Sequence, residues 1–100
     1  MSHTILLVED DANIRQMLSI ALGAEGYLCV EAASVREALS LFNQHRPDLV
    51  ILDLGLPDGE GSEVLKRIRE SSRLPVLVLS ARDQELDKVD LLSRGANDYV

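Results

Sequence analysis

The sequence has few aromatic residues and little capacity for cross-links. Tryptophan is absent, aromatic residues make up 3% of the chain, and Cys29 is its one cysteine. The core must therefore be aliphatic, and Cys29 is expected to be a small buried core residue because it cannot pair within the chain. No apolar run approaches the ~20 residues of a membrane span, and the N-terminal run is too short for a signal peptide. We therefore expect a cytoplasmic protein with no membrane partner.

Positive charge is also scarce. The chain has 10 Lys and Arg against 17 Asp and Glu, which gives a formal net charge of −7. This balance argues against direct nucleic-acid binding by this segment, because a phosphate backbone requires clustered Lys and Arg. In contrast, hydrophobic residues are plentiful, at 46% of 100 positions. That content is enough for one domain with a real core.

Short apolar runs alternate along the chain with helical patterns. The runs predict strands at 4–8, 27–31, 48–53, 75–80 and 98–100. The strands are apolar throughout rather than alternating, which is typical of strands buried on both faces by helices. The alternation of strands and helices therefore predicts an α/β fold with a doubly wound parallel sheet.

Four helices are predicted between these strands. Their apolar faces carry, in order, Ile14, Met17, Leu18, Ala21 and Leu22; Val35, Ala38, Leu39 and Phe42; Val64, Leu65 and Ile68; and Leu86, Val89 and Leu92. Ser34, with Glu37 three residues later, is a capping-box signature and places the start of the second helix. Pro47 follows the end of that helix.

Acidic residues follow two of the predicted strands at the point where each ends. Glu9 and Asp10 follow the first strand, and Asp53 ends the third. Ligand sites of doubly wound sheets lie at the carboxyl ends of the strands, so we expect these carboxylates to converge. Converging carboxylates repel one another unless a pKa rises or a cation binds, and oxygens without His or Cys suit Mg²⁺. Helix capping and turn formation explain Asp11 and Asp58 better than these three.

Four ordered segments carry a family resemblance. They are "ILLVEDD", "DLVILDLGLPDGEG", "PVLVLSAR" and "GANDYV", and they run in order through the whole chain. Together they resemble the receiver domain of two-component response regulators, and most closely those whose output is a winged-helix DNA-binding domain. The resemblance implies a flavodoxin-like five-stranded sheet of order 2-1-3-4-5. It also implies that 1–100 is a receiver, or phosphoacceptor, domain that is incomplete at its C-terminal end.

The resemblance implies roles at the acidic positions. Asp53 would accept a phosphoryl group from the phosphohistidine of a sensor histidine kinase. Asp10 and Asp53 would bind Mg²⁺ directly, Glu9 would act through water, and Gly55 would contribute its backbone carbonyl. The chain would therefore be a self-phosphorylating signalling domain rather than an enzyme.

The resemblance also implies how phosphorylation is passed on. Ser80 would hydrogen-bond a phosphoryl oxygen, Tyr99 would be the aromatic switch that moves with it, and Ala81 would leave room for that movement. These changes would bias the loop after the fourth strand together with the fourth helix. The switch would control transcription, with DNA bound only through an output domain outside this sequence.

The sequence departs from the receiver pattern at its end. The pattern has a lysine three positions beyond the switch tyrosine, then a proline and a last helix, whereas this sequence stops at Val100. We therefore expect a receiver truncated before the last helix. It should accept phosphate less well than a version carrying the lysine and the helix. The uncovered sheet face would favour self-association, as a homodimer or an element-exchanged oligomer.

In the winged-helix subfamily, receivers pair through the fourth helix, the fifth strand and the last helix. Lys88 and Asp98 match charged positions of that surface. Asn97 stands where the family usually has a second aspartate, so one ion pair between subunits is not expected. Solvated surface charge is the alternative interpretation of Lys88 and Asp98, and it is favoured where the last helix is missing.

Three other functions are alternatives. An aspartate-nucleophile phosphatase typically has an Asp-x-Asp pair after its first strand, whereas Glu9 and Asp10 are adjacent here and the apparent nucleophile is on the third strand. The glycines at 55, 59 and 61 do not have the spacing of a nucleotide-binding fingerprint, and no Walker lysine motif is present. A receiver-like interaction scaffold without phosphotransfer is the third alternative. The intact Glu9, Asp10, Asp53 and Ser80 argue against it for the parent protein, and it stays open for a truncated chain.

Overall fold

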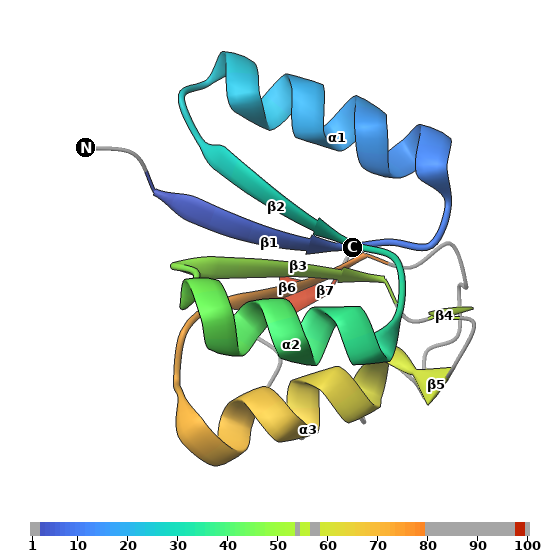
Figure 1. Cartoon of the computed structure of the whole chain (residues 1–100), viewed down its shortest axis with the longest axis vertical. Helices are drawn as coiled ribbons and strands as arrows, with labels where there is room; N and C mark the ends of the chain where they lie inside the picture. Colours follow the sequence, from blue (N-terminus) through green and yellow to red (C-terminus); the bar gives the residue numbers. More distant parts are fainter. Residues whose placement is uncertain (1–2, 54, 57–58, 80–97, 100) are drawn as a thin grey trace.

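Figure 1 shows the fold of the chain, a computed structural model that describes residues 3–53, 55–56, 59–79 and 98–99. The elements in these residues are β1 (Thr4–Val8), α1 (Ala12–Ala24), β2 (Leu28–Ala32), α2 (Val35–His45), β3 (Leu49–Asp53), β4 (Gly55–Leu56), β5 (Gly59–Glu60), α3 (Gly61–Ser71), β6 (Val76–Leu79) and β7 (Asp98–Tyr99). None of these helices has the length and apolar character that a bilayer crossing requires.

Five of the strands form one parallel sheet in the order β2-β1-β3-β6-β7. This is the predicted order 2-1-3-4-5, and it confirms the doubly wound sheet. In Figure 1, α1 covers one face of the sheet, while α2 and α3 lie together on the other. The predicted fourth helix, with Leu86, Val89 and Leu92, lies outside the described residues.

Alternate residues of the central strands point to opposite faces of the sheet, and each face has its own core. On β1, Leu6 and Val8 join the larger cluster beneath α2 and α3, whereas Ile5 and Leu7 join a smaller cluster that packs against α1. All four side chains are buried. Continuous apolar sequence in β1 thus follows from burial on both sides.

The two helices on the larger core match the predicted patterns. Ser34 caps α2, because its Oγ accepts a hydrogen bond from the backbone N–H of Glu37 at 3.1 Å. The Glu37 carboxylate reaches back to the N–H of Ala33 at 3.0 Å, one residue before the cap. In α3, the predicted stripe of Val64, Leu65 and Ile68 is fully buried. Capping and periodicity therefore predicted both helices.

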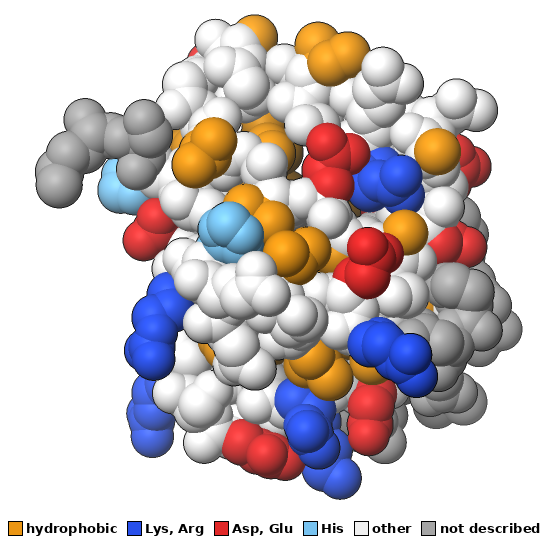
Figure 2. All heavy atoms as spheres, in the orientation of Figure 1, with side chains coloured by type: hydrophobic (Ala, Val, Ile, Leu, Met, Phe, Trp, Pro, Cys, Tyr) orange, Lys and Arg blue, Asp and Glu red, His pale blue; other side chains and the backbone are white. Residues whose placement is uncertain are grey.

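The predicted apolar face of α1 was partly wrong. Leu18 and Leu22 pack against the smaller core, but Ile14 is 40% exposed and Met17 is 61% exposed. The apolar residues of α1 cover a wider part of the helix surface than the part that packs against the sheet. Among the described residues, no second helix lies beside α1 on that face of the sheet to cover the rest. Figure 2 accordingly shows hydrophobic side chains along the top of the molecule, over α1.

Strand β2 is also less buried than predicted. Among the described strands it forms an edge of the sheet, with β1 as its one neighbour. Leu28 is therefore exposed, and Cys29, predicted to be a buried core residue, is half-buried with its Sγ 4.0 Å from the Ser19 carbonyl oxygen. The order 2-1-3-4-5 that the resemblance implied already places this strand at an edge, and that position, rather than the apolar composition of the strand, decides its burial.

Candidate functional site

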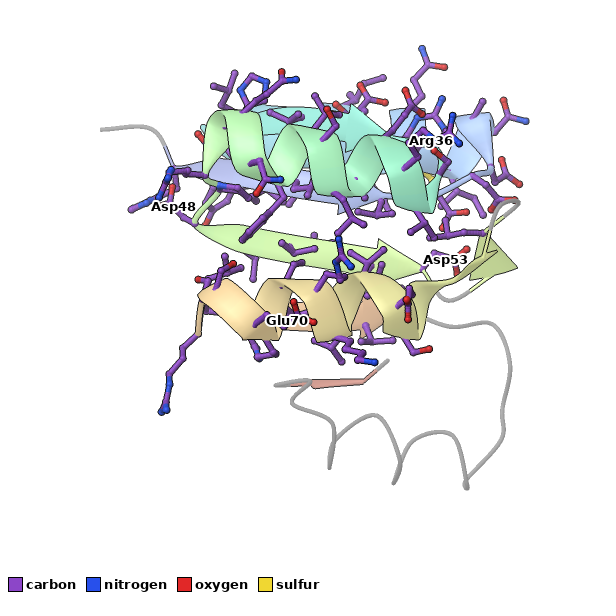
Figure 3. All side chains as sticks on the ribbon, turned by 60° about the horizontal axis from the view of Figure 1, so that its bottom comes forward. Arg36, Asp48, Asp53 and Glu70 are labelled. Carbon is purple, nitrogen blue, oxygen red and sulfur yellow. The ribbon has the colours of Figure 1, made fainter. Side chains whose placement is uncertain are left out.

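The parallel register brings the acidic ends of β1 and β3 together. Val8 pairs with Leu52, so the residue after each, Glu9 and Asp53, lies at the same edge of the sheet. One carboxylate oxygen each of Glu9, Asp10 and Asp53 lies within 4.8 Å of the others. In Figure 3, Asp53 lies at the carboxyl end of β3 and Asp48 at the opposite end. The predicted convergence of the three acids is therefore present.

The three carboxylates differ in their exposure to water. Glu9 is buried, at 7% exposed, Asp53 is half-buried and Asp10 is exposed. Burial raises the pKa of Glu9 above its ordinary value, and the charges of Asp53 and Asp10 raise it further, against the backbone N–H of Asp11. The set consists of carboxylate oxygens without His or Cys, which fits a hard divalent ion such as Mg²⁺.

Asp11 follows these acids in sequence, but its side chain binds the start of α1 instead of joining them. Its Oδ1 accepts hydrogen bonds from the backbone N–H groups of Asn13 at 2.9 Å and Ile14 at 3.2 Å. Asp11 is thus the N-cap of α1, as the sequence predicted. The cap fixes the turn between β1 and α1, and Asp10 lies in this turn.

The glycine-rich segment after Asp53 has more structure than the sequence predicted. β4 and β5 form an antiparallel pair, with Gly55 opposite Glu60 and Leu56 opposite Gly59, and α3 begins directly after it. Leu56 is 9% exposed and belongs to the larger core cluster. This side chain anchors the segment to the core. The available signal was a leucine, one of two at positions 54 and 56, within a glycine-rich stretch.

The structure leaves several predicted residues without description. Outside the described residues lie Asp58, Ser80, Ala81, Lys88 and Asn97. The backbone of Tyr99 is described in β7, where it pairs with Val78, and that of Asp98 pairs with Leu77. Gly55, the predicted carbonyl ligand, lies in β4, two residues beyond Asp53 in sequence.

One residue beside the site was not singled out from the sequence. Arg15 donates from Nη1 to the backbone carbonyl oxygen of Glu9 at 2.8 Å and from Nε to Oε1 of Glu31 at 3.2 Å. Arg15 is the one charged residue between positions 12 and 24. That isolation, in the first turn of the helix that follows the acidic pair, was the signal available.

Comparison with known proteins gives consistent matches. The family model described as "Response regulator receiver domain" matches residues 5–100. The KDP operon transcriptional regulatory protein KdpE of Escherichia coli K12 is 46% identical over 96 residues. The virulence transcriptional regulatory protein PhoP of Salmonella typhimurium 14028s is 47% identical over 97 residues. Each alignment covers 96% of this chain and 43% of the relative, so the chain spans less than half the length of these curated relatives.

Solved receiver domains have the same fold. The receiver domain of the Francisella response regulator 1452 superposes with a TM-score of 0.92 at 30% identity, covering 99% of this chain and 83% of that one. The BeF3-activated N-terminal receiver domain of Klebsiella pneumoniae RstA gives 0.93 at 28% identity, covering 97% and 83%. The fold is α/β and flavodoxin-like, as predicted. The chain therefore belongs to the response regulator receiver domain family.

Proposed function

We propose that residues 1–100 form the phosphoacceptor domain of a two-component response regulator, with Asp53 as the phosphoacceptor. The observation that carries this proposal is the convergence of Glu9, Asp10 and Asp53, with ligand oxygens within 4.8 Å, in a member of the receiver family. The proposed role is a phosphorylation-activated switch rather than a turnover enzyme.

The proposed reaction is phosphoryl transfer to a carboxylate. An oxygen of Asp53 attacks the phosphorus of a kinase phosphohistidine. An O–P bond forms while the P–N bond breaks, and the electron pair of the broken bond returns to the imidazole nitrogen. The product is an acyl phosphate on Asp53. Because the transferring group is mainly stabilised by position and charge, the rigid β3 contributes by fixing Asp53 at the sheet edge.

The acidic residues would hold Mg²⁺ for this step. Asp10 and Asp53 would bind the ion directly, Glu9 through a water, and Gly55 through its backbone carbonyl. When bound, the ion offsets the negative charge of the carboxylates and of the incoming phosphoryl group. The buried position of Glu9, with its raised pKa, supports this assignment, because a cation would favour its ionised form.

The proposed switch involves the two strands beyond β3: Ser80 follows β6 in sequence, and Tyr99 belongs to β7. Ser80 would bind a phosphoryl oxygen, Ala81 would leave room beside it, and Tyr99 would move with Ser80. The register supports this order: Leu79 pairs with Asp53, and Tyr99 pairs with Val78 on the next strand. A signal at β3 would thus pass through β6 to β7.

We infer the wider setting from the relatives. KdpE and PhoP are transcriptional regulatory proteins. We propose that the protein containing this chain is a cytoplasmic regulator. It would act with a sensor histidine kinase and bind DNA through a winged-helix output domain. Receiver pairing would involve the surface of Lys88 and Asp98, as a homodimer or an element-exchanged oligomer.

A mass measurement tests the phosphoacceptor. The chain is incubated with Mg²⁺ and acetyl phosphate, and a base-labile phosphoryl adduct is sought by intact mass. The adduct should form on the unsubstituted chain and be absent from Asp53→Asn, because the amide is not a nucleophile. Asp48→Asn is the matched control, since Asp48 directly precedes β3, at the end of the strand opposite to Asp53. It should keep the adduct.

Two results would count against the proposal. An adduct that survives Asp53→Asn would remove Asp53 from its role. Steady turnover of other phosphate esters would favour an aspartate-nucleophile phosphatase instead, because a receiver keeps its phosphoryl group rather than cycling through substrates.

A further inference from the structure

Arg15 connects three segments that meet at the acidic edge of the sheet. It belongs to the first turn of α1, which lies at the same end of the molecule as the carboxyl ends of β1 and β2 (Figure 1). Its Nη1 donates to the Glu9 carbonyl oxygen, just after β1, and its Nε donates to Glu31 on β2. We propose that Arg15 is a positioning residue that sets the geometry of Glu9 and Asp10 for binding a divalent cation.

The contact with the Glu9 carbonyl acts on the acidic pair through the main chain. That carbonyl belongs to the peptide unit joining Glu9 to Asp10. Since peptide units are planar, a hydrogen bond that fixes the carbonyl also fixes the direction in which Asp10 leaves the strand. Asp10 is exposed, so its packing does not hold it in place. The 2.8 Å bond from Arg15 supplies that constraint.

The polar groups of Glu9 have partners from three segments. Its N–H donates to the carbonyl oxygen of Ala32 at 3.0 Å, its carbonyl accepts from Arg15, and its Oε1 accepts from the N–H of Asp11 at 3.0 Å. The Arg15 bond is the one of these that depends on a side-chain donor, so a substitution can remove it without altering Glu9. Partners behind metal ligands commonly fix ligand orientation in this way.

The two acceptors require the shape of arginine. The planar guanidinium directs Nε to Glu31 and Nη1 to the Glu9 carbonyl, and one group satisfies both. A lysine ammonium on a flexible stem offers less fixed geometry at the same charge. Arg15 is also only 21% exposed, so water competes less for these bonds than it would at the surface.

This inference rests on the proposed function, because it concerns the same metal site. Substitution of Arg15 should weaken Mg²⁺ binding while Asp53 and the carboxylates remain. For Arg15→Met we expect a dissociation constant about 10-fold higher, the lower end for loss of a partner behind a metal ligand. Arg15→Lys should fall between Met and the unsubstituted chain. Glu31→Gln should have a smaller effect, because Arg15 keeps its bond to Glu9.

The experiment is a titration of the full chain with Mg²⁺ alone, followed by the NMR shifts of the backbone amides near Glu9, Asp10 and Asp53. Arg67→Met is the matched control, because it removes the same charge from an exposed position on α3. The melting temperature without Mg²⁺ is measured in parallel. With acetyl phosphate as donor, Arg15→Met should need more Mg²⁺ for half-maximal rate and recover its rate at saturating Mg²⁺.

The outcomes separate this inference from the proposed function. If the unsubstituted chain neither binds Mg²⁺ nor forms the Asp53 adduct, the proposed function fails. If it does both and the Arg15 variants bind Mg²⁺ equally well, only the positioning role is overturned. A lower melting temperature with unchanged Mg²⁺ affinity has the same meaning. Should Arg15→Met not fold, Arg15→Lys and Glu31→Gln decide, and unchanged affinity in both overturns the role.

Discussion

At the scale of single residues, Glu9 is a carboxylate whose charge is disfavoured by its position in the folded chain. It is 7% exposed and shares a small volume with Asp10 and Asp53. Burial is the largest cause of its raised pKa, and the two neighbouring carboxylates add to it. The same features that make Glu9 unfavourable in the free chain make it a good partner for a cation.

The pKa direction fixes how stability depends on pH. Between the ordinary pKa of 4.5 and the higher pKa of Glu9 in the folded chain, the folded chain holds a proton on Glu9 that the unfolded chain has lost. Stability therefore falls as pH rises through this window, and the full cost remains above it. Glu9→Gln removes the charge and keeps an oxygen that can accept from Asp11. Without Mg²⁺, we expect a higher free energy of unfolding at neutral pH, measured by urea denaturation.

The control for this prediction is Glu63→Gln, which removes a negative charge from an exposed position on α3. It should change stability less. With saturating Mg²⁺, the advantage of Glu9→Gln should shrink, because the ion stabilises the unsubstituted chain more. A Glu9→Gln chain less stable than the unsubstituted one at neutral pH, without Mg²⁺, would show that burial does not penalise this carboxylate.

The residues of the site differed in how far the sequence could predict them. Glu9, Asp10 and Asp53 were predictable because acids at the ends of buried parallel strands must meet at one edge. Arg15 was not, since its partners are a main-chain carbonyl and Glu31, which is 16 positions away. Such contacts depend on where α1 lies over β2. Sequence patterns give the helix but not this placement.

At the scale of elements, the predicted capping box of Ser34 and Glu37 is present at the start of α2. Ser34→Ala removes the Oγ that accepts from the Glu37 N–H, and it should cost about 1 kcal/mol of unfolding free energy. Ser40→Ala is the control, because it makes the same change within the exposed part of the same helix. Thermal and urea denaturation measure both. Equal losses in the two variants would mean that the cap does not stabilise α2.

Local sequence predicted less of β4, β5 and the buried face of α1. β4 and β5 have two residues each, too few for an alternating pattern. For α1, periodicity predicted the helix, but a wide apolar arc does not say which line meets the sheet. Leu18 and Leu22 were the residues that did, and Met17 was not. For β4, β5 and α1, tertiary packing decided what the local sequence left open.

At the scale of the whole molecule, the two faces of the sheet are covered unequally in the described residues. The larger cluster joins the sheet to α2 and α3, and the smaller one joins it to α1. The site stands on β1 and β3, which contribute side chains to both clusters. Stability should therefore come mainly from one face, while the geometry of the site depends on the strands between the faces.

Two core truncations test this division. Ile68 is fully buried in the larger cluster, so Ile68→Ala should cost about 2–5 kcal/mol of unfolding free energy. Leu18→Ala, at a half-buried position on α1, should cost less because fewer neighbours lose contact. Urea denaturation gives both values. Under conditions where Ile68→Ala remains folded, its Mg²⁺ affinity should be unchanged, because Ile68 belongs to the larger core cluster, whereas the three carboxylates lie at the carboxyl edge of the sheet.

The comparison with Arg15 makes the last prediction specific. Arg15→Met should change Mg²⁺ affinity more than stability, whereas Ile68→Ala should change stability more than affinity. If both variants lowered the two quantities in proportion, the site would depend on global packing rather than on a local constraint at Glu9. Separate effects would mean that the acidic edge is positioned by the loop between β1 and α1, and that the core beneath α3 only keeps the chain folded.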